Sequence, residues 1–304
     1  MKYFFTYFNS KLKEKTMNFK KLTLLPLLLI LNACRAEPNF VAPSEHALPP
    51  ITRATQSPFS GNTEMAHQKI AKHIILLPDS RPISFGNNIL LLGDPDSQTY
   101  PHGVLGDTIE AKTLYTLDAQ TLKPAAQAFR LPENLVFENN TLAVWGDKIV
   151  AVISGDGAGA RVAVLALQGQ NWQIVAESAP LPSHRWQSPF VFQNQLYAVQ
   201  MPHIVGRLVR YEMQGKRLIE QELGEGFSNH AIGSHDTQIA AVLPEYALIP
   251  QMGFRHVFAL DGSGSLKKLS PELPAKIVRS AVQNHTAYFL LADGSVWTWS
   301  QPER

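Results

Sequence analysis

The sequence predicts an all-β fold built from one four-stranded unit that repeats along the chain. From residue 72 onward, apolar residues rich in Val, Ile, Leu, Phe and Tyr come in runs of four to eight, separated by Gly, Asn, Asp and Pro, which is typical of strands and turns. No window in this part shows sustained helical periodicity. The same pattern of a short strand, a polar turn and a stronger apolar strand then recurs at intervals of 41–59 residues.

Five segments carry this pattern, with anchor positions at Phe85, Val144, Val191, Ile232 and Val282; they are residues 83–92, 143–152, 190–199, 231–242 and 281–290. Each of the first four is followed by a third strand, a turn and a fourth strand, and the third strands are predicted at 114–118, 162–165, 208–211 and 257–262. The fifth segment is followed only by a strand at 296–299. The predicted unit is therefore an antiparallel meander of 40–60 residues.

The length and strand number of this unit resemble those of a β-propeller blade. The resemblance implies a five-bladed β-propeller, or six blades if the first interval of 59 residues contains a degenerate one. A β-sandwich and an open barrel are the alternatives, but neither explains why one unit recurs. The strand at 73–77 has no partner before it and the last unit lacks one strand, so we expect 73–77 to pair with 296–299 and close the ring.

The amino-terminal segment has the parts of a secretory signal. Residues 17–21 are a short basic start, residues 22–30 are an apolar core, and Leu31-Asn32-Ala33-Cys34 follows. The apolar core is well short of the roughly 20 residues that span a bilayer. The Leu-x-Ala-Cys ending resembles the lipobox of bacterial lipoproteins, and translation can start at Met1 or Met17.

This resemblance implies that residues 1–33 are a signal peptide and that Cys34 becomes the lipid-bearing first residue, with palmitate among its acyl chains. Arg35 stands where an aspartate is associated with retention in the inner membrane, so the resemblance implies the outer membrane, on its periplasmic or its surface side. Residues 34–70 are predicted to be a tether, because prolines interrupt any helix or central strand; these are Pro38, Pro43, Pro49, Pro50 and Pro58. Residues 71–304 are the predicted folded body.

Charge and cysteine content argue against nucleic-acid binding and against a disulfide-stabilised fold. The chain has 27 Lys and Arg against 25 Asp and Glu, but six lysines and one glutamate of these lie in residues 1–33. This leaves 21 against 24, a net charge of −3, and no basic run that would favour nucleic acid. Cys34 is the single cysteine, so no intramolecular disulfide can form. No motif indicates a cofactor.

In a propeller, the loops between the second and third strands of a blade and the loops between blades emerge on one face around the channel. On this face we expect a binding site, with candidates at His184, Arg185, Trp186, His203, His230, Tyr246 and Arg279. Trp and Arg are frequent anchors at interfaces. The alternative is that Trp186 packs between blades and that Arg185 is only solvated.

The favoured interpretation is a binding or scaffolding module for an envelope protein or glycan, without a cofactor. The alternative is an envelope glycan hydrolase, because some five-bladed propellers hydrolyse glycans with carboxylates spaced around the channel. Its candidate carboxylates are Asp94, Glu133 and Glu245, all in loops. Asp94 and Asp96 are a weak calcium candidate, since calcium takes six or more oxygen ligands and these two residues alone supply too few.

Overall fold

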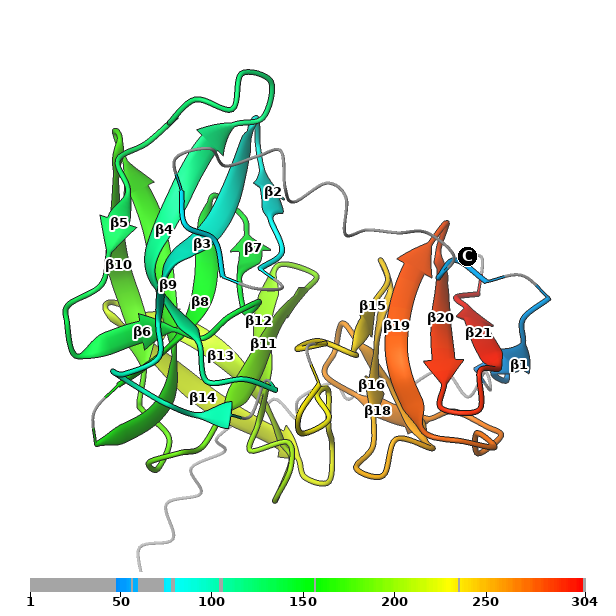
Figure 1. The fold of residues 1–304 in the computed structure, drawn as a ribbon. Helices are drawn as coiled ribbons and strands as arrows, with labels where there is room; N and C mark the ends of the chain where they lie inside the picture. Colours follow the sequence, from blue (N-terminus) through cyan, green and yellow to red (C-terminus); the bar gives the residue numbers. More distant parts are fainter. Residues whose placement is uncertain are drawn as a thin grey trace, which may run out of the picture. The chain divides into compact units, whose positions relative to one another are not determined.

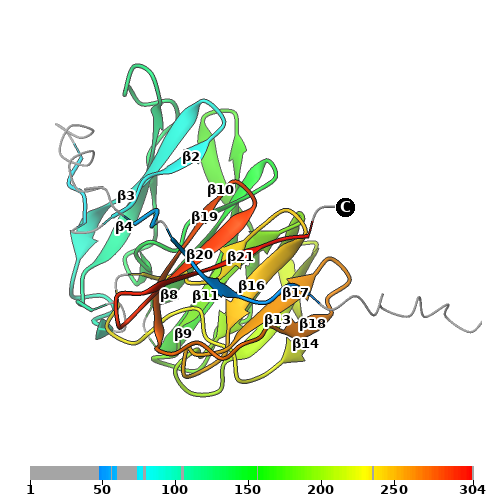
Figure 2. The same ribbon diagram turned by 90° about the vertical axis from the view of Figure 1, so that its right-hand side faces the viewer.

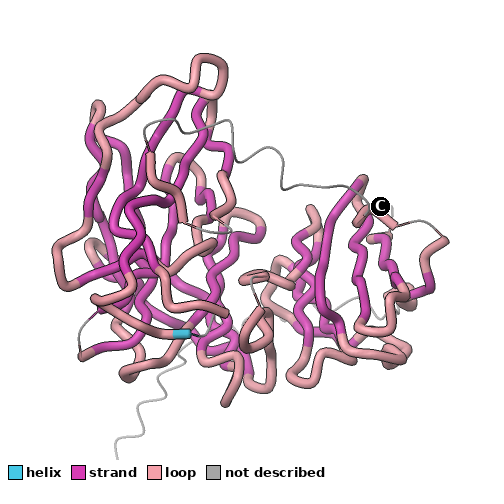
Figure 3. The backbone as a smooth tube through the Cα atoms, in the orientation of Figure 1, coloured by secondary structure: helices cyan, strands magenta, loops and turns pink. Residues whose placement is uncertain are grey.

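The computed structural model describes residues 48–55, 57–59, 74–77, 80–103, 106–155, 157–234 and 236–302. The signal sequence, Cys34 and most of the predicted tether lie outside these residues. Strands and loops dominate the described chain, as Figure 3 shows, and the all-β fold class is confirmed. None of the described segments forms a helix of the length and apolarity that a membrane crossing needs.

The strands that follow residue 80 pair antiparallel in chain order, as the repeat predicts (Figure 1). The first series is β2 (Ile83–Phe85), β3 (Asn88–Asp96), β4 (Glu110–Asp118) and β5 (Phe129–Arg130). The second is β7 (Ala143–Trp145), β8 (Lys148–Gly155), β9 (Ala158–Gln168) and β10 (Asn171–Ser178). Both begin with the tight hairpin that the sequence predicts, with Gly86 and Gly146 in the left-handed conformation that each turn needs.

Three further series complete the described body. The third is β11 (Gln187–Phe192), β12 (Gln195–Gln200), β13 (Arg207–Gln214) and β14 (Arg217–Gly224). The fourth is β15 (Ala241–Val242), β16 (Tyr246–Pro250), β17 (Val257–Asp261) and β18 (Leu266–Lys268). The fifth is β19 (Ile277–Gln283), β20 (Thr286–Leu291), β21 (Val296–Ser300) and β1 (Thr52–Arg53).

The first three series are joined by additional pairings. An extra strand, β6 (Leu135–Phe137), pairs with both β4 and β8, and β10 pairs with β14 in parallel over two residues. These links merge the three series into one 13-stranded sheet, whereas the fourth and fifth series remain separate four-stranded sheets. No sheet of the described residues closes on itself.

The hydrophobic core lies between consecutive series. Leu90, Leu114 and Ile149 belong to a cluster between the first and second series, and Val164 and Val209 to one between the second and third. The third and fourth series share a cluster, and so do the fourth and fifth. Because a single meander can bury only one face by itself, this packing is what stabilises each series.

The predicted closing strand is wrong. Within residues 74–77, Leu76 forms a bridge with Gly93 of β3, and Ile75 is 69% exposed. The last unit is instead completed by β1, in which Thr52 lies opposite Thr298 of β21, and Figure 2 shows β1 running beside β21. The amino end of the body therefore does complete the last meander, but with a different segment.

Apolar burial explains why β1 takes this place. Ile51 is 2% exposed in the core of the fourth and fifth series, and its N–H donates to the carbonyl of Ser270 at 2.8 Å. The indole Nε1 of Trp299 donates to the carbonyl of Pro49 at 2.8 Å. Prolines are tolerated next to an edge strand, since their missing N–H costs no ladder bond there. This part of the predicted tether is thus packed against the body.

The fourth unit also departs from its predicted register. Residues 231–234 form turns and no strand, and the predicted anchor Ile232 is 73% exposed. The hairpin is instead formed by β15 and β16, with Pro244 and Glu245 in its turn. The turn-like residues Gly233 and Ser234 suggested the earlier hairpin, but they belong to the loop that precedes the unit.

Candidate ligand site

Loops from the first three series and the segment after β14 line one pocket of about 560 Å³. Its lining residues come from the loop after β3, the β10–β11 and β12–β13 loops and the segment after β14; they are His102, Gly103, His184, Arg185, Trp186, Met201, Pro202, His203, Ile204 and Ile232. Four of the seven predicted binding residues, His184, Arg185, Trp186 and His203, therefore lie around a single pocket.

Backbone hydrogen bonds hold two of these loops together. Met201 N–H donates to the carbonyl of Trp186 at 2.8 Å, which joins the β12–β13 loop to the β10–β11 loop. The carbonyl of Met201 in turn accepts the N–H groups of Ile204, Val205 and Gly206. Gly206 is required, because its φ is +66° and a Cβ there would lie 2.0 Å from the carbonyl oxygen of Phe227.

The β10–β11 loop is also held by hydrogen bonds from β9. Gly159 N–H donates to the carbonyl of Leu181, and Ala160 N–H donates to that of Arg185. A Cβ at Gly159 would lie 2.1 Å from the carbonyl oxygen of Pro182, so this glycine allows the loop to approach β9. The loop that carries His184 and Arg185 is therefore held on the sheet.

Aromatic rings form two groups at the pocket. The ring of His184 stacks on that of Tyr100 with centroids 5.6 Å apart, and His102 packs edge-on against both. In the second group, His230 lies between Trp186, at 4.6 Å, and His203, at 5.0 Å. His230, the fifth predicted binding residue, is fully buried behind the lining residues. Its Nδ1 lies 3.0 Å from the carbonyl oxygen of Asp236.

Burial favours the neutral form of two of the pocket's histidines, His203 and His102. It lowers the pKa of His203 to about 4, with a further contribution from the nearby His230. Burial, and then the neighbouring His184 and Arg185, lower the pKa of His102. Burial also raises the pKa of Tyr100 to about 12, helped by the negative charge of Glu138. At neutral pH these two histidines therefore offer one N–H donor and one acceptor each.

Three buried nitrogen atoms on lining residues have no hydrogen-bond partner among the described residues: Trp186 Nε1, His102 Nδ1 and His203 Nε2. Trp186 is only 2% exposed, so its ring is packed in the interior, as the alternative interpretation expects. Its indole N–H nevertheless has no acceptor among the described residues. A buried polar atom without a partner costs about 1–3 kcal/mol. Such atoms around one pocket are what a ligand would satisfy.

Arg279 and Tyr246 lie elsewhere. Arg279 Nε is 3.7 Å from Asp236 Oδ2, and Arg81 Nη2 is 2.9 Å from Asp236 Oδ1. Arg279 is thus linked to His230 through Asp236, whose carbonyl oxygen lies beside the His230 ring. Tyr246 packs edge-on against Trp299 at 5.4 Å and lines a separate pocket of about 350 Å³ with Glu245 and Asp261.

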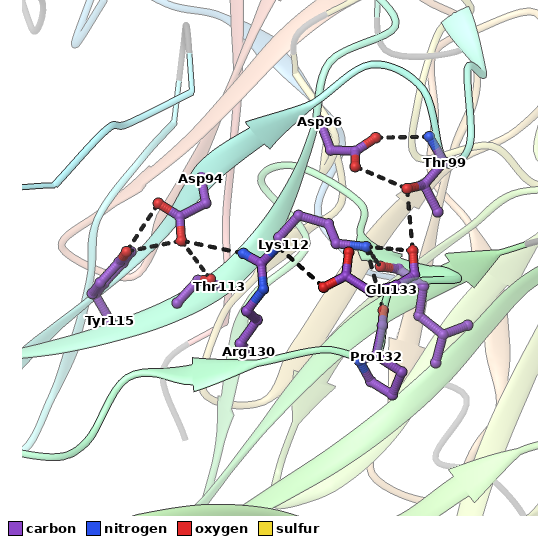
Figure 4. Close-up of polar contacts among 10 residues, drawn as sticks. Asp94, Asp96, Thr99, Lys112, Thr113, Tyr115, Arg130, Pro132 and Glu133 are labelled. Carbon is purple, nitrogen blue, oxygen red and sulfur yellow. Dashed lines mark hydrogen bonds and ion pairs between the residues drawn. The ribbon is translucent and has the colours of Figure 1, made fainter.

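The candidate catalytic carboxylates are already engaged or exposed, as Figure 4 shows for two of them. Asp94 accepts hydrogen bonds from Thr113 Oγ1 at 2.7 Å and from the hydroxyl of Tyr115, and it lies 3.6 Å from Arg130 Nη1. Glu133 reaches the same guanidinium at 3.5 Å with a side chain that is 84% exposed. Glu245 lines the pocket of Tyr246 in the fourth series, whereas Asp94 and Glu133 belong to the first series and the loop after it. Asp94, Glu133 and Glu245 are therefore not brought together around one pocket of the described chain.

Asp94 and Asp96 do not converge on one point. Asp96 accepts the N–H groups of Gln98 and Thr99 and the hydroxyl of Thr99, which makes it the cap of a tight turn, as Figure 4 shows for Thr99. Asp94 bonds instead to side chains of β4. Within the described ranges, no group of three or more His, Cys, Asp or Glu residues is placed to hold a metal ion.

Sequence reasoning missed a pair of buried glutamates near the pocket. Glu110 is 1% exposed and Glu138 is fully buried, and their carboxyl groups contact each other. Glu110 Oε2 accepts the N–H of Asn139 at 2.7 Å and Glu138 Oε1 accepts the hydroxyl of Ser154 at 2.6 Å. Glu110 Oε1 and Glu138 Oε2 are buried and have no hydrogen-bond partner among the described residues. Burial of two neighbouring carboxyl groups disfavours the charged form and so favours protonation of the pair.

Burial raises the pKa of both members of the pair: that of Glu138 to about 7, and that of Glu110 well above its ordinary value with the charge of Glu138 as second cause. A nearby lysine is likewise buried, since Lys112 is 2% exposed and its Nζ donates to the carbonyls of Pro132, Glu133 and Leu135 (Figure 4). The one signal in the sequence was Glu138 directly after the apolar residues 135–137.

Neither a protein-family model nor a curated protein matches this chain. Among solved structures, BamB from Moraxella catarrhalis is 16% identical with a TM-score of 0.44, over 74% of this chain and 58% of that chain. Virginiamycin B lyase from Staphylococcus aureus is 10% identical with a TM-score of 0.43, over 76% and 73%. YjhT is 12% identical with a TM-score of 0.44, over 71% and 73%. Since each TM-score is below 0.5, we take fold and function from this chain's own strands and side chains.

Proposed function

We propose that this chain is a binding protein of the bacterial envelope, built as a five-bladed propeller, which holds an envelope protein or small ligand in the pocket between its first three series. The five antiparallel series and the core clusters between consecutive series support the propeller. The observation that carries the binding function is the pocket itself, with three buried nitrogens that have no partner among the described residues. Binding-site pockets combine apolar walls with a few such polar groups.

The pocket rim can be tested by crosslinking in intact cells. We expect Ile232→Asp to reduce capture of the bound partner at least ten-fold, because Ile232 lines the pocket and is 73% exposed, so that the new carboxylate blocks the site without disturbing the core. Arg185→Ala should reduce capture as well. The measurement is the yield of crosslinked complex for equal amounts of each variant.

Ile219→Asp is the matched control, since Ile219 is an exposed isoleucine on β14 that does not line the pocket. Its capture should equal that of the unchanged chain. Equal capture with Ile232→Asp would show that the partner binds another surface, and the proposal would fail.

We further propose that Cys34 carries the lipid that attaches the body to the outer membrane, with residues 1–33 removed as a signal peptide and most of residues 34–70 as a spacer. The support is the Leu-x-Ala-Cys sequence after a short apolar core. Cells fed an alkyne-labelled palmitate should label the unchanged chain and not Cys34→Ser, and globomycin should cause the precursor to accumulate. Asn32→Ala should still be labelled. Label on Cys34→Ser would contradict the proposal.

A further inference from the structure

We propose that the pocket binds the carboxyl-terminal residue of a peptide, with an apolar side chain against the isoleucine rim and the carboxylate at Arg185. The proposal rests on the proposed binding function and names the ligand class. It follows from three properties of the lining residues: an apolar wall, an excess of positive charge, and buried groups that match a peptide N–H and a carboxylate.

The apolar wall is formed by Met201, Pro202, Ile204 and Ile232. Ile204 is 55% exposed and Ile232 is 73% exposed, and both lie on the rim of the same pocket. An exposed cluster of large apolar side chains beside a pocket indicates an apolar ligand group. The pocket's volume of about 560 Å³ admits an amino-acid-sized ligand.

The residues that line the pocket carry a positive charge. No Asp or Glu is among the lining residues, whereas Arg185 is. Within the described part of the chain, Arg185 forms no ion pair, and its Nη1 donates to the carbonyl of its neighbour His184. Arg81 and Arg279 both pair with the carboxylate of Asp236, so this group of three side chains has one more positive than negative charge. It lies next to His230. An anionic group on the ligand would balance this excess, and arginine binds carboxylates in a two-pronged geometry.

The buried nitrogens offer complementary hydrogen bonds. Trp186 Nε1 can only donate, so it requires an acceptor such as a carboxylate or carbonyl oxygen. His203 is neutral and donates to the backbone of His230, so its Nε2 is an acceptor without a partner among the described residues. A ligand that carries an N–H next to a carboxylate satisfies both, and the last residue of a peptide is such a group.

The test compares ligands that differ only in the terminal charge, using the solubilised full chain and isothermal titration calorimetry. The probes are N-acetyl-phenylalanine, its amide, and a six-residue peptide ending in phenylalanine with a free or an amidated carboxyl group. We expect each acid to bind at least ten-fold more tightly than its amide. Arg185→Gln should remove this difference and leave the affinity for the amides unchanged. Arg217→Gln, an exposed arginine of β14 that loses the same charge, should keep the difference.

The two peptides distinguish the source of the ligand. Tighter binding of the free hexapeptide than of N-acetyl-phenylalanine would assign the site to chain ends, and binding of N-acetyl-phenylalanine alone would assign it to single acylated amino acids. Equal affinity for acids and amides would overturn the carboxylate inference and leave the binding function intact. If no probe binds but Ile232→Asp still reduces crosslinking, the carboxylate inference fails and the binding function stands. If no probe binds and Ile232→Asp has no effect on crosslinking, both proposals fail.

Discussion

Glu138→Gln is expected to stabilise the folded protein at alkaline pH and to remove the part of its pH dependence that Glu138 contributes. In the unchanged protein the pKa of Glu138 is raised from 4.5 to about 7 by burial. Between these two values the folded state keeps a proton that the unfolded chain has already released. Folding therefore takes up a proton at Glu138, and this group lowers the free energy of unfolding by about 3 kcal/mol as the pH rises through this window.

Glutamine suits this position. Its amide oxygen can accept the hydroxyl of Ser154, and its NH₂ group can donate to Glu110 Oε1, which has no hydrogen-bond partner among the described residues. The variant therefore keeps the bond to Ser154 and offers Glu110 a donor, without a charge of its own to bury. Urea unfolding at pH 5 and pH 8 measures the effect, and the variant should exceed the unchanged protein at pH 8 by about 2–3 kcal/mol.

Glu133→Gln is the control, because the side chain of Glu133 is 84% exposed and its loss should leave the pH dependence as it was. The same slope for Glu138→Gln and the unchanged protein would mean that the carboxyl pair does not hold its proton in the folded state.

Trp299→Ala is expected to destabilise the protein by about 3–5 kcal/mol, as large-to-small changes of fully buried aromatic residues do. Trp299 is 1% exposed, packs against Tyr246 and donates its indole N–H to Pro49. Its loss opens a cavity in the core that joins the fourth and fifth series and frees the segment before β1. Urea unfolding gives the change in free energy, and limited proteolysis shows whether residues 48–55 become accessible.

Trp299→Phe separates the contribution of the buried ring from that of the indole hydrogen bond. It keeps most of the buried ring but removes the donor to Pro49, so it should cost about 1–2 kcal/mol. Thr298→Ala, at the neighbouring position on the opposite face of β21, should change the stability little. A loss below about 1 kcal/mol for Trp299→Ala would show that the contact between β1 and β21 does not stabilise the body.

The strands were predictable where apolar runs and turn residues agree. The hairpins at Gly86 and Gly146 and the pairing of β11 with β12 follow from the sequence in this way. The fourth unit was misplaced, because Gly233 and Ser234 have the composition of a hairpin turn. The closing strand was missed since Pro49 and Pro50 indicate a tether, and only the buried Ile51 and Trp299 show that the segment packs.

The candidate site was predictable from topology more than from motifs. Expecting loops of several units on one face brought His184, Arg185, Trp186 and His203 together, although they are up to 19 residues apart in sequence. Tyr246 did not join them, because the fourth unit starts its second strand there. The Glu110–Glu138 pair could not be foreseen, since the burial of a carboxyl group depends on contacts between strands 28 residues apart.

The two-residue ladder between β1 and β21 has a mechanical consequence. A pull on the chain ahead of Leu48, for example from a bead in an optical trap, is carried first by the hydrogen bond between Trp299 and Pro49 and by the buried Ile51, and then by Thr52 and Arg53. The two residue pairs between β1 and β21 and the hydrogen bond from Trp299 form a short attachment compared with the longer ladders of the other sheets. Under tension the body should therefore lengthen in a small first step, as residues 48–55 detach, before any larger sheet gives way.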